Sequence, residues 1–360
     1  MDTNNYDIIC WGDNTYGTCN PPQLKDVIAI SAGFWHGMAL RSNGTVVCWG
    51  KNIDGQCDIP NNLKKVIAIS AGNKTSYVLQ YDGTVVGWGN NNDKTIFNGK
   101  LVSIGCHIPP GLNKVVAITT NMYDDSITVL KNDGTLVHCG TRIDNNTCSV
   151  QIELKRVVLF ATTGENNMVI QEDGTTKAWG RNISSEALKI PSKLNSIKSI
   201  TGSGDSFIAL TNNGTVIPLT NVSLDPNKLK DIEIEKIPIY MQSAGLKPLT
   251  NASFDKNGFM NNVVAISGKS HVIALNSNGT VVCWGSNYRG VLNVPVGLKD
   301  VVAISAGGLV SMALKYNGLV SRPTIRVSLL HTIVGFITKS FVIICILTLL
   351  VIIYIILNSR

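Results

Sequence analysis

The 360-residue sequence predicts an all-β fold, a seven-bladed β-propeller closed by its N-terminal strand, followed by one C-terminal transmembrane helix. Three observations lead to this prediction. A strand-like phrase of the type "VIAISAG" occurs seven times, an Asn-Gly or Asp-Gly pair follows every copy, and no segment before residue 324 shows sustained helical periodicity. A unit of about 40 residues cannot bury both faces of its own small sheet, whereas seven units arranged in a ring can.

Each unit begins with the apolar strand phrase. Most copies start 38 to 42 residues apart, and two units carry inserts, at residues 90–109 and 218–262, which we expect to loop out from the ring. The seven copies start at Val27, Val66, Val115, Val157, Ile197, Val263 and Val301.

A tight turn is predicted between the second and third strands of each unit. Its glycine is always preceded by Asn or Asp, residues that tolerate the positive φ of a type I′ hairpin. The glycines are Gly44, Gly83, Gly134, Gly174, Gly214, Gly279 and Gly318. The third strand then ends in Trp-Gly at Trp49, Trp88, Trp179 and Trp284, with Cys139-Gly140 in the third unit and Pro218-Leu219 in the fifth.

The seventh unit lacks its own third strand. It reaches Pro323 where tryptophan is expected, and proline cannot donate a hydrogen bond within a sheet. Residues 7–19 carry the missing strand and loop, with Trp11 in the tryptophan position. We therefore expect residues 1–323 to form one propeller whose seventh blade is split between 301–323 and 6–26.

The pattern "VVAISAGxxHxxALxxNGTVVCWGxNxxGQC", carried best by residues 27–57 and 263–290, resembles the regulator of chromosome condensation repeat. The resemblance covers about residues 6–323 and implies a seven-bladed propeller. It implies no single function, because members of the family include nucleotide exchange factors for a small GTPase, regulators of ubiquitin ligases, ultraviolet sensors and β-lactamase inhibitors. Ultraviolet sensing uses clustered tryptophans, whereas here only Trp35 lies outside the structural tryptophan position of the repeat.

Basic residues recur just before the first strand of several units. Equivalent positions of neighbouring blades share one rim, so blades seven and one to four are expected to present a basic arc suited to an acidic protein partner or to anionic headgroups. A solvated charged face is the alternative interpretation. The residues of the arc are Lys25, Lys64, Lys65, Lys114, Lys155, Arg156 and Lys299.

No catalytic group, metal site or cofactor site is predicted. We expect no carboxylate, serine or histidine to recur on the strands that line the central channel, and no Cys-x-x-Cys pair occurs. His36 and His271 share their position in the repeat with mostly small polar residues, so we expect them to bond neighbouring backbone groups. The other residues at this position are Thr75, Ser126, Asn166, Ser206 and Val310.

The cysteines also follow the repeat. Cys10, Cys48, Cys139 and Cys283 share one strand position, and Cys19, Cys57 and Cys148 lie nine residues after the first three. Free cysteine packs as a small hydrophobic residue. Disulfides between the two positions are the alternative for an extracellular domain, in which some of the eight Asn-x-Ser/Thr sequons would be glycosylated.

The composition changes after Pro323. The uncharged run from Phe341 to Leu357 would span about 26 Å as a helix, which is the short end of the transmembrane range. We predict a juxtamembrane linker over 324–340, a transmembrane helix over 341–357 and a tail of residues 358–360. Basic residues are more numerous before the run than after it, which favours a cytosolic propeller and a tail-anchored, single-pass topology.

The sequence thus predicts a membrane-anchored, non-enzymatic scaffold that binds an unidentified protein as a monomeric propeller. The formal net charge is +7 without a lysine- or arginine-rich run, so no nucleic-acid partner is expected. The alternative function is a membrane-tethered nucleotide exchange factor for a small GTPase, which the family resemblance implies. A third interpretation is an extracellular, lectin-like or inhibitory propeller.

Overall fold

The computed structural model describes residues 6–90, 93–97, 100–104, 108–109, 111–121, 125–139, 149–150, 154, 156–163, 166–180, 197–204, 206–219 and 260–318. Within these residues, no helix is long and apolar enough to cross a membrane. The predicted span 341–357, its linker and tail, and Lys155 of the basic arc lie outside the described residues.

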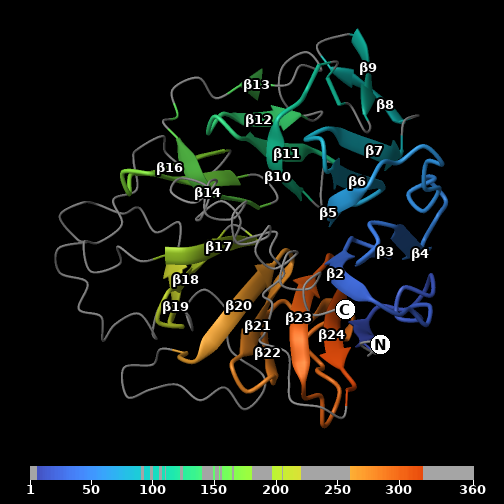
Figure 1. Ribbon diagram of the computed structural model, residues 1–360, viewed down its shortest axis with the longest axis vertical. Helices are drawn as coiled ribbons and strands as arrows, with labels where there is room; N and C mark the ends of the chain where they lie inside the picture. Colours follow the sequence, from blue (N-terminus) through green and yellow to red (C-terminus); the bar gives the residue numbers. More distant parts are fainter. Residues whose placement is uncertain are drawn as a thin grey trace, which may run out of the picture.

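The described strands form eight antiparallel sheets, and seven of them, the blades, lie around a central axis, as predicted for a propeller (Figure 1). Blade one contains β2 (Val27–Ala32), β3 (His36–Arg41) and β4 (Val46–Gly50); blade two contains β5 (Val66–Ala71), β6 (Thr75–Gln80) and β7 (Val85–Gly89). Blade three contains β10 (Val115–Thr120), β11 (Ile127–Lys131), β12 (Leu136–Cys139) and β13 (Ser149–Val150). Blade four contains β14 (Val157–Thr162), β15 (Asn166–Gln171) and β16 (Thr176–Gly180); blade five contains β17 (Ile197–Ser203), β18 (Ser206–Thr211) and β19 (Val216–Leu219). Blade six contains β20 (Val263–Gly268), β21 (His271–Asn276) and β22 (Val281–Gly285).

Blade seven joins the two ends of the described chain. It contains β23 (Val301–Ala306), β24 (Val310–Tyr316) and, as its outer strand, β1 (Tyr6–Gly12). The register runs from Tyr6 opposite Tyr316 to Gly12 opposite Val310. The Asp13 N–H continues the pairing by donating to the Leu309 carbonyl at 2.8 Å. The N-terminal strand therefore completes blade seven, as the sequence predicts.

The inserted segment 90–109 forms a separate hairpin. Its strands β8 (Asp93–Phe97) and β9 (Lys100–Ile104) pair with each other and with no blade. The insert 218–262 lies mostly outside the described residues. Its first residue, Pro218, belongs to β19, the outer edge strand of blade five, where the missing N–H leaves no ladder bond unmade.

The hairpin turns differ from the predicted type I′ geometry. In blade one only Gly44 has a positive φ, 85°, and its N–H donates to the Arg41 carbonyl at 2.9 Å. This is a three-residue loop with glycine in the left-handed region. Asn43 contributes a side-chain acceptor instead, because its Oδ1 accepts the Thr45 N–H at 3.0 Å. The same bond joins Asp82 to Thr84, Asp133 to Thr135, Asp173 to Thr175, Asn213 to Thr215 and Asn278 to Thr280.

The turn glycines also connect neighbouring blades. The Gly44 carbonyl accepts the N–H of Val66, the first residue of the next blade, at 3.2 Å. A Cβ at Gly44 would lie 2.8 Å from the Lys65 side chain, so the close approach as well as the positive φ requires glycine. The equivalent bonds join Gly83 to Val115, Gly134 to Val157, Gly214 to Val263 and Gly279 to Val301.

Gly318 does not follow this pattern, and its predicted role as a seventh turn glycine is wrong. Its φ is not positive, and its carbonyl accepts no bond from Val27. The reason is the closure of the ring. β24 is paired on its outer side by the N-terminal strand β1 rather than by a strand that follows it in the sequence.

The core lies between the blades rather than within them. Each pair of neighbouring blades shares one cluster of buried apolar residues. Between blades seven and one, for example, Ile8 and Val310 pack with Val27 and Trp49. The innermost strands follow one another around the channel, and β23 of blade seven contacts β2 of blade one. Every blade thus depends on two neighbours for its burial, and an opened ring would expose two apolar faces.

The tryptophan of the third strand joins its blade to the linker that precedes the blade. The indole Nε1–H of Trp49 donates to the Thr18 carbonyl at 2.8 Å, and Trp88 donates to the Gln56 carbonyl at 3.0 Å. Trp11 donates to the Val291 carbonyl at 2.8 Å. Trp284 is also buried, whereas Trp179 is half-buried.

Candidate functional site

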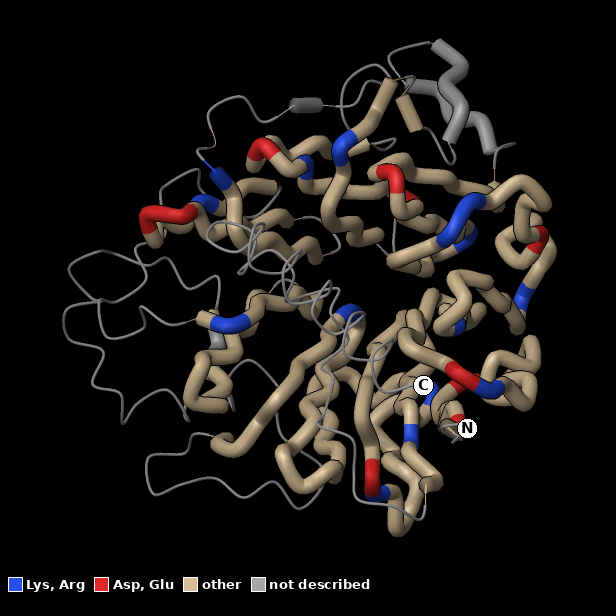
Figure 2. Tube along the Cα trace, viewed as in Figure 1, with Lys and Arg blue, Asp and Glu red and all other residues tan. Residues whose placement is uncertain are grey.

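The predicted basic arc lies on the end of the ring that carries the hairpin turns, called here the turn face. Its six described members are all exposed: Lys25, Lys64, Lys65, Lys114, Arg156 and Lys299. Basic positions are spread around the ring, and acidic positions lie beside several of them (Figure 2). The strength of the arc therefore depends on which of its charges remain unpaired.

The position directly before each first strand has a backbone role. In the six blades where this position is described, its carbonyl accepts an N–H from the end of the second strand or from the residue that follows it, in the pairs Asp26–Ser42, Lys65–Tyr81, Lys114–Asn132, Arg156–Glu172, Asn262–Ser277 and Asp300–Tyr316. Five of these six acceptors have a φ between 33° and 63°, the region in which Asn and Asp are enriched. Backbone geometry thus accounts for a polar residue at this position, and only blades two to four place a basic residue there.

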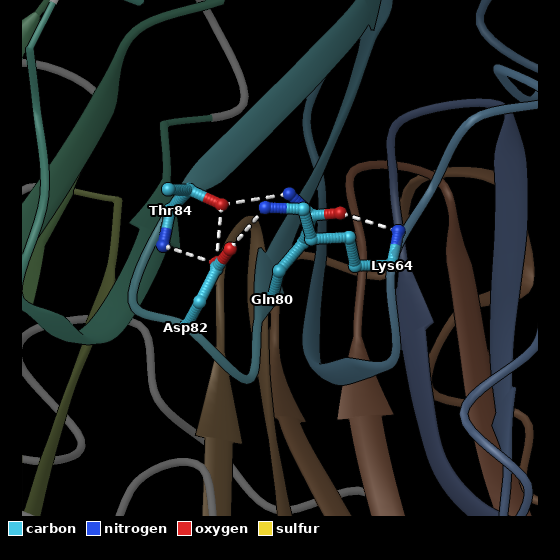
Figure 3. Close-up of polar contacts among 4 residues, drawn as sticks. All are labelled: Lys64, Gln80, Asp82 and Thr84. Atoms are coloured by element: carbon cyan, nitrogen blue, oxygen red, sulfur yellow. Dashed lines mark hydrogen bonds and ion pairs between the residues drawn. The ribbon is translucent and has the colours of Figure 1, made fainter.

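Lys64 is paired within its own blade. Its Nζ lies 2.5 Å from Asp82 Oδ2, and its N–H donates to Gln80 Oε1 at 2.6 Å (Figure 3). The Thr84 N–H and O–H both donate to Asp82 Oδ1. The bond from Lys64, followed by the bonds from Thr84, lowers the pKa of the exposed Asp82 carboxyl to about 2. Lys64 therefore contributes less to the arc than its sequence position predicts.

Arg156 is paired in the same way, with 2.9 Å between its guanidinium and Glu172 Oε2. Among the described residues, the other basic members of the arc have no carboxylate partner: Lys25, Lys65, Lys114 and Lys299. Lys25 and Lys299 are each followed directly by an aspartate. Lys65 and Lys114, on blades two and three, are therefore the described members of the arc that have neither an ion-pair partner nor an aspartate directly after them.

Exposed apolar side chains lie on the same face of the ring as these two lysines. Each first strand has a β-bulge after its first residue, and in blades one and two the residues at the bulge are Ile28 and Ile67, which are 50% and 42% exposed. Tyr81, in the turn of blade two, is 76% exposed, and its N–H donates to Lys65. We call Ile28, Lys65, Ile67, Tyr81 and Lys114 the turn-face patch. Unpaired cations around exposed apolar groups are suited to a partner of opposite charge.

The central channel contradicts one expectation, because serine does recur on its strands. Ser31 accepts the Ala71 N–H at 3.0 Å, Ser305 accepts the Ala32 N–H at 2.9 Å, and Ser267 accepts the Ala306 N–H at 3.0 Å. Each serine thus accepts a hydrogen bond from a backbone N–H of the innermost strand in the next blade. That strand is the last of its sheet, so no further strand could accept a hydrogen bond from this N–H. This bonding assigns the serines a structural role.

The two repeat histidines also connect neighbouring blades. Ser76 Oγ donates to the Gln56 carbonyl at 2.7 Å, so His36 Nε2–H donates to Ser76 Oγ at 3.0 Å and the ring is neutral. His271, Ser311 and the Val291 carbonyl repeat this arrangement, at 2.7 and 2.8 Å. Burial lowers the pKa of both imidazoles to about 3, and the charge of Lys269 lowers that of His36 further in the same direction. Their bonds reach a neighbouring hydroxyl, whereas the sequence predicts a backbone group.

Lys269 was not singled out from the sequence, although it replaces a glycine of the repeat: the equivalent residues are Gly33, Gly72 and Gly307. Its side chain reaches from blade six across the channel, where Nζ donates to the carbonyls of Ala32 and Ala71 in blades one and two. Lys269 is half-buried, and desolvation of its side chain by the surrounding protein lowers its pKa to about 8. The replacement of a repeat glycine by a lysine is the sequence feature that could have identified Lys269 as a candidate site residue.

Five described cysteines are free thiols: Cys10, Cys19, Cys48, Cys57 and Cys283. A hydrogen bond between the thiols of Cys48 and Cys57 raises the pKa of Cys48 and lowers that of Cys57. Cys139 is disulfide-bonded, and Cys148 lies outside the described residues. Among the described residues, no group of three or more His, Cys, Asp or Glu side chains could hold a metal ion.

Trp35 lies on the opposite end of the ring, in an aromatic cluster. Its ring packs against Phe34 and Tyr16, with centroids 4.3 and 6.1 Å away, and Lys51 Nζ lies 4.3 Å from its centroid. Lys51 also lies over the Tyr16 ring at 5.1 Å. These contacts join the linkers that precede and follow blade one, which accounts for an additional tryptophan without a light-sensing role.

Comparison with known proteins identifies repeats of one type. Residues 27–56, 66–94 and 263–291 match the model of the regulator of chromosome condensation (RCC1) repeat. These segments fall in blades one, two and six, whose third strands end in Trp-Gly. No curated protein matches the chain as a whole.

Solved structures show the same fold at low sequence identity. Yeast RCC1 (Prp20), crystallised with Kap60, has a TM-score of 0.63 at 15% identity, over 88% of this chain and 90% of that one. Prp20p from Saccharomyces cerevisiae, studied with its binding properties to Gsp1p and histones, has a TM-score of 0.60 at 15% identity, over 89% and 93%. Human WBSCR16 has a TM-score of 0.58 at 16% identity, over 87% and 99%. The chain is thus an RCC1-like propeller in fold.

Proposed function

We propose that this RCC1-like propeller is a non-enzymatic protein-binding module, tethered to a membrane by residues 341–357 with the propeller in the cytosol. The turn-face patch carries the proposal. It combines two unpaired lysines with the exposed Ile28, Ile67 and Tyr81 on one face of the ring, and it therefore fits a protein segment that combines acidic and apolar residues. Prp20p, a protein of similar fold, was studied for binding to Gsp1p and histones, which supports protein capture as a use of such a ring.

Reversing the charges of the two patch lysines tests the capture. We expect the full-length Lys65→Glu/Lys114→Glu variant to lose partners that the natural chain retains in affinity capture, as compared by quantitative mass spectrometry. Capture by the natural chain should also weaken between 50 and 200 mM salt, because screening shortens the reach of exposed charges to about 10 Å or less. The matched control is Lys64→Glu/Asp82→Lys, which keeps the net charge and re-forms the ion pair in the opposite sense.

Equal capture by the natural chain and the Lys65→Glu/Lys114→Glu variant would contradict the proposal. The same preparations distinguish the alternative function. If the captured partner is a small GTPase whose nucleotide release is accelerated by the full chain, the module is a membrane-tethered exchange factor. If the natural chain captures no protein partner but binds vesicles containing phosphatidylserine, the patch binds lipid headgroups.

The tether has its own test. The run from Phe341 to Leu357 is uncharged, whereas an arginine at the centre of a transmembrane helix costs about 2.5–3.5 kcal/mol. We expect the natural chain to remain in the membrane pellet during alkaline carbonate extraction and the Leu349→Arg/Ile352→Arg variant to be released. Leu347→Ile serves as the control and should stay in the pellet. Release of the natural chain would contradict the tether.

A further inference from the structure

The central channel contains a cluster of hydrogen-bond donors that the repeat does not require. The cavity along the axis has a volume of about 90 Å³. This is several times the roughly 10–15 Å³ that one water molecule needs. All seven first strands contribute to its wall, so it runs through the ring rather than between two blades. It admits water and small ions.

The channel serines have hydrogens left to donate. Ser31, Ser267 and Ser305 each use Oγ to accept a backbone N–H from the next blade. A hydroxyl that accepts one bond still has an O–H to donate. No acceptor among the described residues takes these three hydrogens, and the three serines line the cavity on blades one, six and seven, which are consecutive. Three hydroxyl donors are thus available to the channel on one side.

Lys269 is the only lysine or arginine among the described residues that line the cavity, and these residues include no Asp or Glu. Its ammonium has three donors, of which two are used on the carbonyls of Ala32 and Ala71. These carbonyls accept hydrogen bonds from the ammonium but carry no formal negative charge. The ammonium is therefore enclosed without a counter-ion on the described wall, which is costly unless an anion accompanies it.

We propose that the channel binds one small oxyanion, a phosphate or a carboxylate, between the ammonium of Lys269 and the hydroxyls of Ser31, Ser267 and Ser305. The negative charge supplies the missing counter-ion, and its several oxygen lone pairs match the donors that the wall leaves unused. The site is independent of protein capture on the turn face, so either can fail without the other.

The pKa of Lys269 is consistent with this arrangement. Enclosure by the protein lowers it to about 8, because desolvation disfavours the charged form. An oxyanion beside Nζ favours that form again. The bound ion would also link blade six more firmly to blades one and two, since Lys269 already spans that distance.

Calorimetric titration of the purified full chain in detergent tests the site. We expect saturable binding of one sodium phosphate or sodium acetate per chain, at an ionic strength held constant with sodium chloride. The tighter of the two identifies the natural source as a phosphate or a carboxylate. Lys269→Met should weaken binding at least about tenfold, the loss expected for a charge-assisted hydrogen bond. The matched control, Lys315→Met, removes a lysine of β24 that does not line the cavity and should bind as the natural chain does.

A second measurement needs no variant and therefore no assumption about folding. Saturating phosphate or acetate should slow acetylation of Lys269 by acetic anhydride relative to that of Lys315 in the same sample, as measured by peptide mass spectrometry. The proposal is overturned if neither oxyanion binds saturably, if Lys269→Met binds as tightly as the natural chain, or if the ratio of the two acetylation rates does not change.

Discussion

Replacing Trp11 with alanine is expected to destabilise the propeller by about 3–5 kcal/mol, the usual cost of truncating a buried tryptophan. Trp11 is 6% exposed and packs with Leu292 and Val301 between blades six and seven. Its indole also donates to the Val291 carbonyl. The loss weakens β1, which completes the last blade, so it acts on the closure of the whole ring. Thermal unfolding followed by circular dichroism should show a midpoint lower by roughly 10 °C.

The control is Thr15→Ala, an exposed position in the loop directly after the same strand. It should leave the midpoint within about 1–2 °C, because exposed substitutions away from special features usually cost under 0.5 kcal/mol. Deleting residues 1–19 removes the whole outer strand and should destabilise the chain more than Trp11→Ala does. Deleting residues 324–360 should leave the midpoint unchanged. An N-terminal deletion that melts like the natural chain would refute closure by β1.

Lowering the pH from 7.5 to 5.0 is expected to cost about 4 kcal/mol of unfolding free energy through His36 and His271 together. Both are buried as neutral rings, with a folded pKa of about 3 against an ordinary 6.5. Between these two values the unfolded chain binds protons that the folded chain does not, so stability falls as the pH falls below 6.5. The change is about 1.4 kcal/mol per pH unit for each histidine. Urea midpoints at the two pH values measure it.

Substitutions at two positions separate the histidines from other titrating groups. His271→Asn keeps a donor toward Ser311 but cannot be protonated, so it should remove about half of the pH dependence whatever its effect on stability at pH 7.5. Asp82→Asn should leave the dependence unchanged over this range, because Asp82 titrates below its ordinary value of 3.8 in the folded chain. Identical pH dependence in His271→Asn and the natural chain would show that acid acts elsewhere.

Much of the fold was predictable because its determinants are local. The strand phrase, the turn glycine and the Trp-Gly ending lie within one unit of the repeat, and each specifies a backbone geometry that tolerates few other residues. Closure by β1 was predictable for the same reason, since Trp11 and the strand around it match the portion missing after β24. The turn type was predicted wrongly. Asn43 could favour the turn through a positive φ or through its side-chain oxygen as a hydrogen-bond acceptor. Which of the two it does depends on hydrogen bonds that the residue pair Asn-Gly does not specify.

The candidate sites were less predictable, because they depend on which groups meet. Lys64 and Lys65 are adjacent residues of the same type, yet only Lys64 forms an ion pair with Asp82. The apolar part of the turn-face patch follows from a bulge that exposes Ile28 and Ile67, whereas the strand pattern alone indicates burial.

By itself the sequence determined that this chain forms a ring of repeated three-stranded units, because each unit carries its strands, turn and inter-blade contacts in about 40 residues. It also determined that the N-terminal strand closes the ring. Only the tertiary structure decided which charges remain unpaired, that the channel serines bind the next blade, and that Lys269 lies opposite blades one and two. The reason is physical: a charge or a hydroxyl acts through its neighbours, and in a ring those neighbours lie one or more blades away in the sequence.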